Sequence, residues 1–156
     1  MRAPTDLRLE RFQRLLDQIS YESSNGSTIV VEGQKDRKSL RDIGITGPIL
    51  CIQSSRKNIV GFVENLTGIR RVIVLTDFDR EGVSLAKKLS RMLNAQSLHV
   101  NMILWKNLRE LTRSEVRSIE ELPKYCERLQ AEALHKTSPK RIRLKISQSI
   151  TPRTWS

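Results

Sequence analysis

A run of four apolar residues at positions 72–75, three of them β-branched, constrains the fold more than any other stretch of the sequence. Such a run predicts a short strand that is buried on both faces, as in a parallel sheet. Acidic side chains follow at every second position, at Asp77, Asp79 and Glu81, and Gly82 then leads into apolar residues at helical spacing. A strand that ends in acids before a helix puts those acids at the carboxyl edge of a sheet, where open α/β sheets bind ligands.

Strand and helix patterns alternate along the chain around this stretch. Buried-strand signals recur at residues 28–31 and 49–52, and the apolar residues of 98–105 predict a fourth strand. Helical patterns lie between the strands, at residues 34–43 and 59–66. Regular alternation with short links predicts an α/β, Rossmann-like fold, in which helices flank a central four-stranded parallel sheet and the crossovers are right-handed.

Segments of different character precede and follow this core. Residues 1–26 form an amphipathic helix, with Thr5 or Asp6 as its N-cap, and we expect this helix to cover a face of the sheet. Residues 27–110 hold the alternating core. Residues 111–156 comprise a further helix and a basic tail.

The C-terminal region combines a capped helix with this tail. Ser118 and Glu121 fit a capping box, and apolar residues at helical spacing follow, with Pro123 tolerated because it lies close to the helix start. The tail, residues 135–156, carries six Lys or Arg residues and no acid. Apolar and basic residues alternate at 141–146, which indicates an edge strand or an arm ordered by nucleic acid or another subunit, with a disordered tail as the alternative.

Charge and composition limit the partners. The 156-residue chain has a formal net charge of +11, which favours a polyanion, nucleic acid first and an anionic membrane surface second. No apolar run approaches the roughly 20 residues that a membrane span requires, and the N-terminus leads into a charged helix, so we expect no membrane and a cytoplasmic location. Cys51 and Cys126 fit reduced thiols and argue against a structural zinc site.

Acids that are distant in sequence would meet if the first and third predicted strands are neighbours. Glu32 follows the first strand, and Asp77 and Asp79 follow the third. Carboxylates that close repel one another unless a cation lies between them. Oxygen ligation of a hard ion that keeps several waters is typical of Mg²⁺, with Mn²⁺ as a substitute. Beside a basic surface such an ion suits phosphodiester chemistry, and Gly33 and Gly82 would let the backbone approach phosphate oxygens.

Each of these signals also has an ordinary structural explanation. Asp79 can serve only as an N-cap, and Glu81 can be a first-turn acid that the helix dipole favours. Glu32 and Gly33 can form an ordinary turn from strand to helix. Two acid-plus-glycine turns after two buried strands, in a basic protein, are harder to explain in this way.

At these two turns the sequence resembles the Toprim family, the catalytic domain shared by topoisomerases, primases, recombination proteins and certain nucleases. The family pattern is a strand that ends in Glu-Gly and a later strand that ends in Asp-x-Asp, and the matching residues are Glu32-Gly33 and Asp77-Phe78-Asp79. The continuation Arg80-Glu81-Gly82 is close to the type IA topoisomerase version. Gln34-Lys35-Asp36 is more similar to the nucleases that mature small ribosomal RNA. The resemblance covers residues 28–105.

The resemblance implies a role for each acid. Glu32, Asp77 and Asp79 would be the catalytic acids. Glu32 would act as general acid or base and also belong to the metal site, and Asp77 and Asp79 would be Mg²⁺ ligands. Glu81 would be a third acid of the metal cluster, and Asp36 would support the site. Charge and position at loop starts, or in the tail, suggest further residues for phosphate contacts. These candidates are Lys35, Arg56, Lys57, Arg80, Lys140, Arg141, Arg143 and Lys145.

Features that other branches of the family require are absent from the sequence. Tyr21 and Tyr125 lie outside the core, so a topoisomerase nucleophile is missing, and neither a cysteine zinc module nor a phosphate-binding ATPase loop is visible. We therefore expect a small stand-alone Toprim protein that hydrolyses phosphodiester bonds with Mg²⁺, as an endonuclease on structured RNA in preference to DNA. The alternatives are a nucleic-acid-binding module with little turnover and a component of a ribonucleoprotein or DNA-repair assembly. The tail could also mediate a homo-oligomer.

Overall fold

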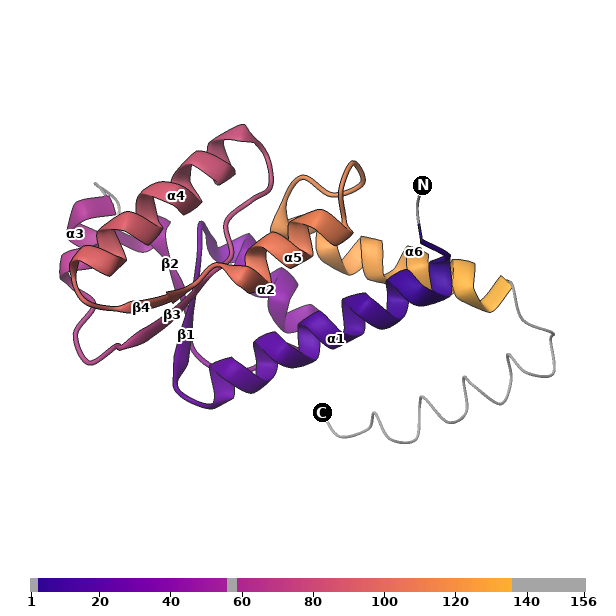
Figure 1. Ribbon diagram of the computed structural model, residues 1–156, viewed down its shortest axis with the longest axis horizontal. Helices are drawn as coiled ribbons and strands as arrows, with labels where there is room; N and C mark the ends of the chain where they lie inside the picture. The colour runs from indigo at the N-terminus through magenta and orange to yellow at the C-terminus, as the bar shows by residue number, and fades with distance from the viewer. Residues whose placement is uncertain (1–2, 56–58, 136–156) are drawn as a thin grey trace.

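A four-stranded parallel sheet forms the centre of the molecule, as the sequence predicts (Figure 1). The computed structural model describes residues 3–55 and 59–135. The predictions for Arg56, Lys57 and the basic tail therefore fall outside the described residues. The strands are β1 (Ser27–Val31), β2 (Ile49–Cys51), β3 (Arg71–Val74) and β4 (His99–Asn101), and their order in the sheet is β2-β1-β3-β4.

Helices cover both faces of this sheet. They are α1 (Thr5–Ser24), α2 (Gln34–Asp42), α3 (Ile59–Glu64), α4 (Arg80–Ala95), α5 (Ile103–Leu111) and α6 (Leu122–His135), with short 3-10 turns η1 (Ile52–Ser55) and η2 (Ile119–Glu121). In Figure 1, α3 and α4 lie on one face, whereas α1, α2, α5 and α6 gather on the other. Right-handed crossovers place α2 on the opposite face from α3 and α4, because the chain moves one way from β1 to β2 and the opposite way from β2 to β3 and β4.

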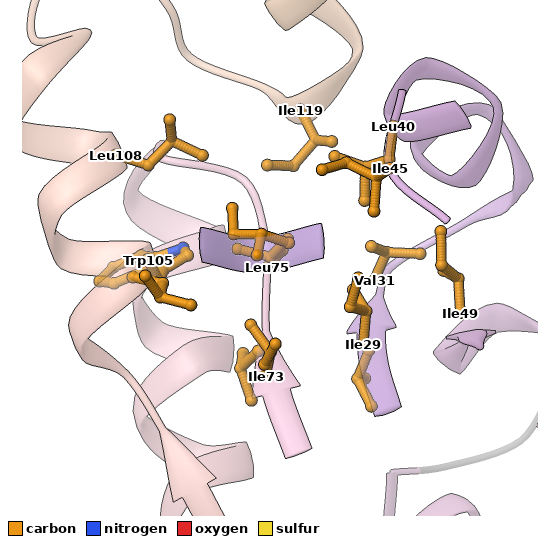
Figure 2. Close-up of a cluster of buried hydrophobic side chains, with 14 of the residues drawn as sticks. Ile29, Val31, Leu40, Ile45, Ile49, Ile73, Leu75, Trp105, Leu108 and Ile119 are labelled. Carbon is orange, nitrogen blue, oxygen red and sulfur yellow. The ribbon is translucent and has the colours of Figure 1, made fainter. Parts of the chain in front are cut away.

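The two central strands are buried on both faces, as their apolar runs predict. All five residues of β1 are buried, and in β3 only Arg71 at the start is exposed. On the face shown in Figure 2, alternate side chains of the two strands and of the residues that follow them meet apolar side chains of α2, α5 and η2. The labelled members are Ile29, Val31, Ile73, Leu75, Leu40, Ile45, Ile49, Trp105, Leu108 and Ile119.

The fourth strand is shorter than the apolar pattern predicts. The pattern extends to Trp105, but β4 ends at Asn101 and α5 begins at Ile103. Asn101 causes this change, because its side-chain oxygen accepts hydrogen bonds from the backbone N–H groups of Ile103 (2.9 Å) and Leu104 (3.3 Å). These bonds satisfy donors that the first turn of a helix leaves unpaired. The apolar residues of this stretch therefore form the buried face of a helix.

The N-terminal helix packs mainly on other helices, and less on the sheet than we expect from its pattern. Pro4 precedes its first turn, so Thr5 and Asp6, the predicted caps, lie inside the helix. α1 runs along α5 and α6 and also contacts β1. Phe12 of α1 meets Tyr125 of α6 edge to face, with ring centroids 5.3 Å apart.

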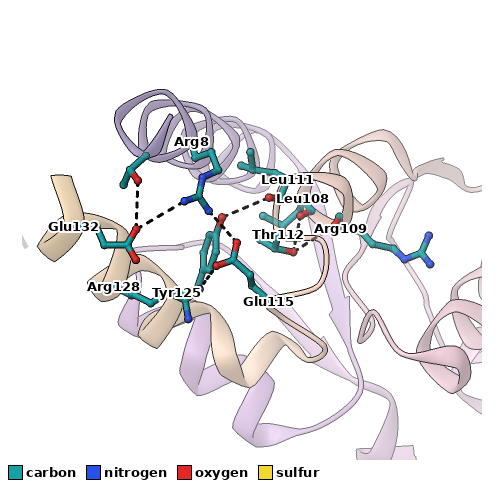
Figure 3. A network of polar contacts seen from close by, with 10 residues as sticks. Arg8, Leu108, Arg109, Leu111, Thr112, Glu115, Tyr125, Arg128 and Glu132 are labelled. Carbon is teal, nitrogen blue, oxygen red and sulfur yellow. Dashed lines mark hydrogen bonds and ion pairs between the residues drawn. The ribbon is translucent and has the colours of Figure 1, made fainter. Parts of the chain in front are cut away.

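Ion pairs join the same helices at the rim of this contact (Figure 3). The guanidinium of Arg8 donates to Glu115 at 2.9 Å and lies 3.8 Å from a carboxylate oxygen of Glu132. Arg128 donates to the other carboxylate oxygen of Glu115 at 2.7 Å. α1 is thereby tied to α6 through the loop that follows α5.

Two further features match their sequence signals. Neither cysteine is joined in a disulfide within the described residues; Cys51 is buried at the end of β2 and Cys126 is partly buried in α6. Pro123 is the second residue of α6, where its missing N–H costs no hydrogen bond.

In the part of the chain that the structure describes, no helix is both long and apolar enough to cross a membrane.

The contact between α1 and α6 predicts how strongly Phe12 contributes to the stability of the protein. Replacing Phe12, which is fully buried, with alanine should lower the free energy of unfolding by about 3–5 kcal/mol, because a cavity forms beside Tyr125. Urea denaturation followed by circular dichroism measures this loss. The control is Arg14→Ala on the same helix, whose side chain is 70% exposed and which should change stability by about 0.5 kcal/mol or less. Equal effects of the two substitutions would contradict the packing described for α1.

Candidate functional site

The candidate site lies where β1 and β3 end side by side. The two strands pair in parallel, with Val30 opposite Val74. Glu32 directly follows β1, and its carboxylate accepts a hydrogen bond from the backbone N–H of Asp77 at 3.0 Å. The structure thus brings together two acids that lie 45 residues apart in the chain.

Asp77 is held from a second direction as well. Its Oδ1 accepts a hydrogen bond from the backbone N–H of Ile119 at 2.9 Å. The next residue, Phe78, donates its own backbone N–H to the carbonyl oxygen of Arg117 at 2.8 Å. The segment before α6 therefore packs directly against the turn that carries this acid.

Asp79 and Glu81 stand at the start of α4. Asp79 is the N-cap, and its Oδ1 accepts from the backbone N–H of Gly82 at 2.7 Å. Glu81 is exposed in the first helical turn. Both acids therefore have the local structural roles that the sequence allows: Asp79 caps α4, and Glu81 is an acid of its first turn. The cap uses one carboxylate oxygen of Asp79 and leaves the second available for another partner.

Gly82 is required because α4 starts very close to the preceding turn. A Cβ atom at Gly82 would lie 2.0 Å from the carbonyl oxygen of Asp77. Buried hydrogen bonds fix this arrangement, from the Thr76 hydroxyl to the carbonyl of Gly82 (2.8 Å) and from the Trp105 indole N–H to the carbonyl of Thr76 (2.9 Å). The role of Gly82 here is therefore steric. A Cβ at Gly33, by contrast, would meet only the end of the Gln53 side chain.

Burial and mutual repulsion raise the pKa values of three carboxyl groups at this edge. Burial is the largest cause for Glu32, Asp36 and Asp77, and nearby carboxylates add to it. The pKa of Asp36 rises to about 6, although its carboxylate accepts the backbone N–H of Gly33 at 3.0 Å. The charge of Glu120 in η2 contributes to the raised pKa of both Asp36 and Asp77. Extra negative charge is therefore costly here, and a cation would reduce that cost.

The donor set fits a hard cation with few protein ligands. Glu32, Asp77 and Asp79 each use one oxygen to accept a backbone N–H. The second oxygen of each carboxylate receives no hydrogen bond from residues 3–55 and 59–135. Within these same ranges, no three acidic, His or Cys side chains are grouped closely enough to enclose a metal ion. Mg²⁺ is commonly bound through one or two carboxylates, with waters and phosphate oxygens completing its shell.

Basic side chains extend from the site along α4. Lys35 and Arg80 are exposed in the first turns of α2 and α4. Lys87 and Arg91 share the exposed face of α4 with Arg80, because they follow it at helical spacing. In the described part of the chain, Arg80, Lys87 and Arg91 form no ion pair. The basic face of α4 is not among the predictions from the sequence, although the spacing of Arg80, Lys87 and Arg91 is visible there.

Two other contributions were also missed. Glu120 is close enough in space to affect the acids, but it lies far along the chain from both motifs. The Ile119 N–H bonds Asp77, but a backbone donor leaves no signal in the amino-acid sequence. Only the folded chain reveals either contribution.

Comparison with known proteins agrees with this fold. Residues 27–105 match the family model described as the Toprim domain. The chain belongs to the Toprim family. The Toprim domain suggests a metal-dependent activity related to nucleic acids, and Toprim domains typically bind Mg²⁺ through acidic residues.

Particular relatives come from archaea and bacteria. The chain is 34% identical over 125 residues to a UPF0292 protein of Methanosarcina acetivorans, covering 80% of this chain and 85% of that protein. It is 31% identical over 113 residues to a UPF0292 protein of Thermococcus kodakarensis, covering 72% and 84%. A solved structure of a protein from Aquifex aeolicus superimposes with a TM-score of 0.59 at 25% identity, covering 70% of this chain and 95% of that one.

The close approach of Gly82 to Asp77 predicts that alanine at position 82 lowers stability, although helix propensity alone predicts that it raises stability. Gly82→Ala should destabilise the protein by about 2 kcal/mol or more, because the new Cβ must displace the Asp77 backbone. In an unobstructed helix the same change would stabilise by about 1 kcal/mol. Thermal and urea unfolding provide the measurement, with the exposed Ser84→Ala on the same helix as control. A stabilised Gly82→Ala variant would be incompatible with the packing of α4 on this turn.

Asp36 gives a prediction about pH. Its pKa in the folded protein is about 6, above the ordinary 3.8, so its ionisation opposes folding. Stability from this group is fully present below about pH 4 and is lost as pH rises through about 6. Asp36→Asn removes this loss, so the variant should gain roughly 2 kcal/mol relative to wild type between pH 4 and 7.5.

Urea unfolding in EDTA at several pH values tests the Asp36 prediction. The matched control is Asp42→Asn at the other end of α2, an exposed acid paired with Lys38 at 3.0 Å. This control should show no comparable gain over the same pH range. A stability difference between Asp36→Asn and wild type that stays constant with pH would contradict the raised pKa.

Proposed function

We propose that this protein hydrolyses phosphodiester bonds in structured RNA with the help of Mg²⁺, Mn²⁺ being a substitute. The proposal is supported above all by one observation: Glu32 bonds the backbone of Asp77 at the carboxyl ends of two neighbouring strands. The raised pKa values of both acids add weight, because they mark a place where a cation is favoured.

The acids divide the chemistry between them in this proposal. Asp77 and Asp79 would hold the metal ion through the carboxylate oxygens that the backbone does not use, and Glu81 in the first turn of α4 would be a further ligand. When bound, Mg²⁺ neutralises phosphate charge and favours attack by water. Glu32 takes the proton from the attacking water or gives one to the leaving oxygen, and its raised pKa brings it closer to the working pH of a general acid or base. Asp36 holds the turn after β1 through the Gly33 N–H.

Hydrolysis is preferred to strand transfer because of where the tyrosines lie. Tyr21 is exposed near the end of α1, which leads into the start of β1 and therefore lies at the opposite edge of the sheet from the acids. Tyr125 is a buried residue of α6 whose ring packs against Phe12 of α1. Neither side chain is at the acids to serve as a nucleophile, so water takes this role in the proposal.

The nucleic acid would run from the acids along the exposed face of α4. Arg80, Lys87 and Arg91 span about 16 Å of helix at 1.5 Å per residue. Their side chains supply positive charge for backbone phosphates without reading sequence. The preference for RNA over DNA rests on the similarity of Gln34-Lys35-Asp36 to the nucleases that mature ribosomal RNA. The tail residues Lys140, Arg141, Arg143 and Lys145 are proposed as additional phosphate contacts.

A second candidate is a nucleic-acid-binding module with little turnover. One observation favours it: Asp79 and Glu81 are exposed, and no three potential ligands are gathered around one point in the described ranges. In this case the acids would provide a weak metal site or none, and the basic face of α4 would carry the function. A role in a ribonucleoprotein or repair assembly would be a form of this candidate.

Cleavage assays separate the two candidates. End-labelled RNA and DNA hairpins of the same sequence are incubated with wild type in Mg²⁺, Mn²⁺ or EDTA, and with Asp77→Asn and Glu32→Gln. The nuclease proposal expects metal-dependent cleavage of RNA, lowered by about 100-fold or more in each variant. Glu10→Gln is the control, because this exposed acid of α1 pairs with Arg14. Tight binding without cleavage, unchanged in both site variants, would favour the binding module and overturn the nuclease.

A further inference from the structure

A segment beyond the Toprim match lies against the candidate site. We name residues 116–121 the strap, since they run from the end of the loop that follows α5 across the turn after β3. The Toprim match ends at residue 105. The strap nevertheless donates the Ile119 N–H to Asp77 Oδ1 (2.9 Å) and accepts the Phe78 N–H on the Arg117 carbonyl (2.8 Å). The turn that carries the acid is therefore bonded to the strap at two adjacent residues.

The strap has its own internal support. The carboxylate of Glu121 accepts hydrogen bonds from the backbone N–H of Ser118 (2.9 Å) and of Arg117 (3.1 Å), and from the Ser118 hydroxyl (2.9 Å). The side chain of Ile119 is completely buried, and Figure 2 shows it beside Leu40 of α2. The strap is thus fixed in place by contacts that involve none of Glu32, Asp77 and Asp79.

This arrangement controls the orientation of the Asp77 carboxylate. A bond from a backbone N–H to a charged carboxylate is shorter and stronger than a neutral hydrogen bond. With Oδ1 held by Ile119, rotation of the carboxylate is restricted and Oδ2 keeps one direction. Loss of the bond would let the carboxylate turn away from the other acids, which repel it.

We propose that the strap is part of the functional site, with the Ile119 N–H as a positioning group that orients Asp77 toward the metal ion. The inference rests on the proposed function, because it takes Asp77 as a metal ligand. It extends the functional unit from residue 105 to residue 121. Partners of this kind behind a metal ligand typically change metal affinity or activity by about 10- to 100-fold when they are removed.

A proline substitution can remove this N–H with little change to the backbone. Ser118 has an extended backbone (φ −136°, ψ 157°), which is the conformation that a residue before proline prefers. Ile119 is the first residue of η2, a position at which proline is tolerated. Ile119→Pro also shortens a buried side chain, so Ile119→Ala is the matched control, because it keeps the N–H while removing more of the side chain.

Metal binding is the direct readout for these variants. Isothermal titration calorimetry with Mn²⁺ is carried out on wild type, Ile119→Pro, Ile119→Ala and Asp77→Asn, each checked for native circular dichroism. Ile119→Pro should bind Mn²⁺ about 10-fold or more weakly than wild type, and cleavage should fall in parallel. Ile119→Ala should be less stable but bind Mn²⁺ within about 3-fold of wild type, because its N–H remains. Equal weakening in both variants, or wild-type binding by Ile119→Pro, would overturn the proposal.

The wild-type protein gives a second measurement that does not depend on the folding of any variant. In ¹⁵N-isoleucine-labelled protein, the amide resonance of Ile119 should shift when Mg²⁺ is added. The internal control is Ile103, whose N–H is bonded to the uncharged Asn101 side chain at 2.9 Å and should not shift. An unmoved Ile119 resonance at saturating Mg²⁺ would overturn the role of the strap.

The outcomes also separate this inference from the proposed function. If Asp77→Asn abolishes Mn²⁺ binding while Ile119→Pro leaves it intact, only the role of the strap is wrong. If wild type binds no Mn²⁺ and Asp77→Asn behaves identically, the metal-dependent function fails and the inference fails with it.

Discussion

The parallel pairing of β1 with β3 is the constraint on which the rest of the structure depends. Because the two strands end at the same edge, Glu32 meets the backbone of Asp77 at 3.0 Å. Burial on both faces makes this pairing stable, since all of β1 and nearly all of β3 are covered by helices. α4 then starts so close to the turn after β3 that only glycine fits at position 82. Packing, turn geometry and the position of the acids therefore have a common origin.

The acids at this edge oppose stability. Burial and neighbouring carboxylates raise the pKa values of Glu32, Asp36 and Asp77, so their ionised forms are disfavoured in the folded chain. Backbone N–H groups offset part of the cost, because each of these carboxylates accepts at least one hydrogen bond from the main chain. Ionisable groups whose pKa values are shifted by burial and by a neighbouring charge are common at functional sites, and this cluster costs the fold stability. A cation bound there would both stabilise the protein and create a reactive centre.

The elements outside the family match contribute more than coverage. α1 joins α5 and α6 through the Phe12–Tyr125 contact and the Arg8 ion pairs. α6 in turn follows the strap, whose backbone bonds Asp77 and Phe78. The helical layer on this side of the sheet is thus continuous with the environment of the acids.

The sequence by itself determined the α/β architecture and the carboxyl-edge position of Glu32, Asp77 and Asp79, because buried strands and the turns after them are encoded by local patterns of apolar residues, acids and glycine. The prediction from the sequence was wrong about the length of the fourth strand. The Asn101 side chain accepts backbone N–H groups of the residues that follow, so the apolar run there forms a helix. Tertiary structure alone decided which strands are neighbours and which backbone groups face the acids. The Ile119 N–H is the clearest case, because every residue except proline carries such a donor and only the fold can aim one at Asp77.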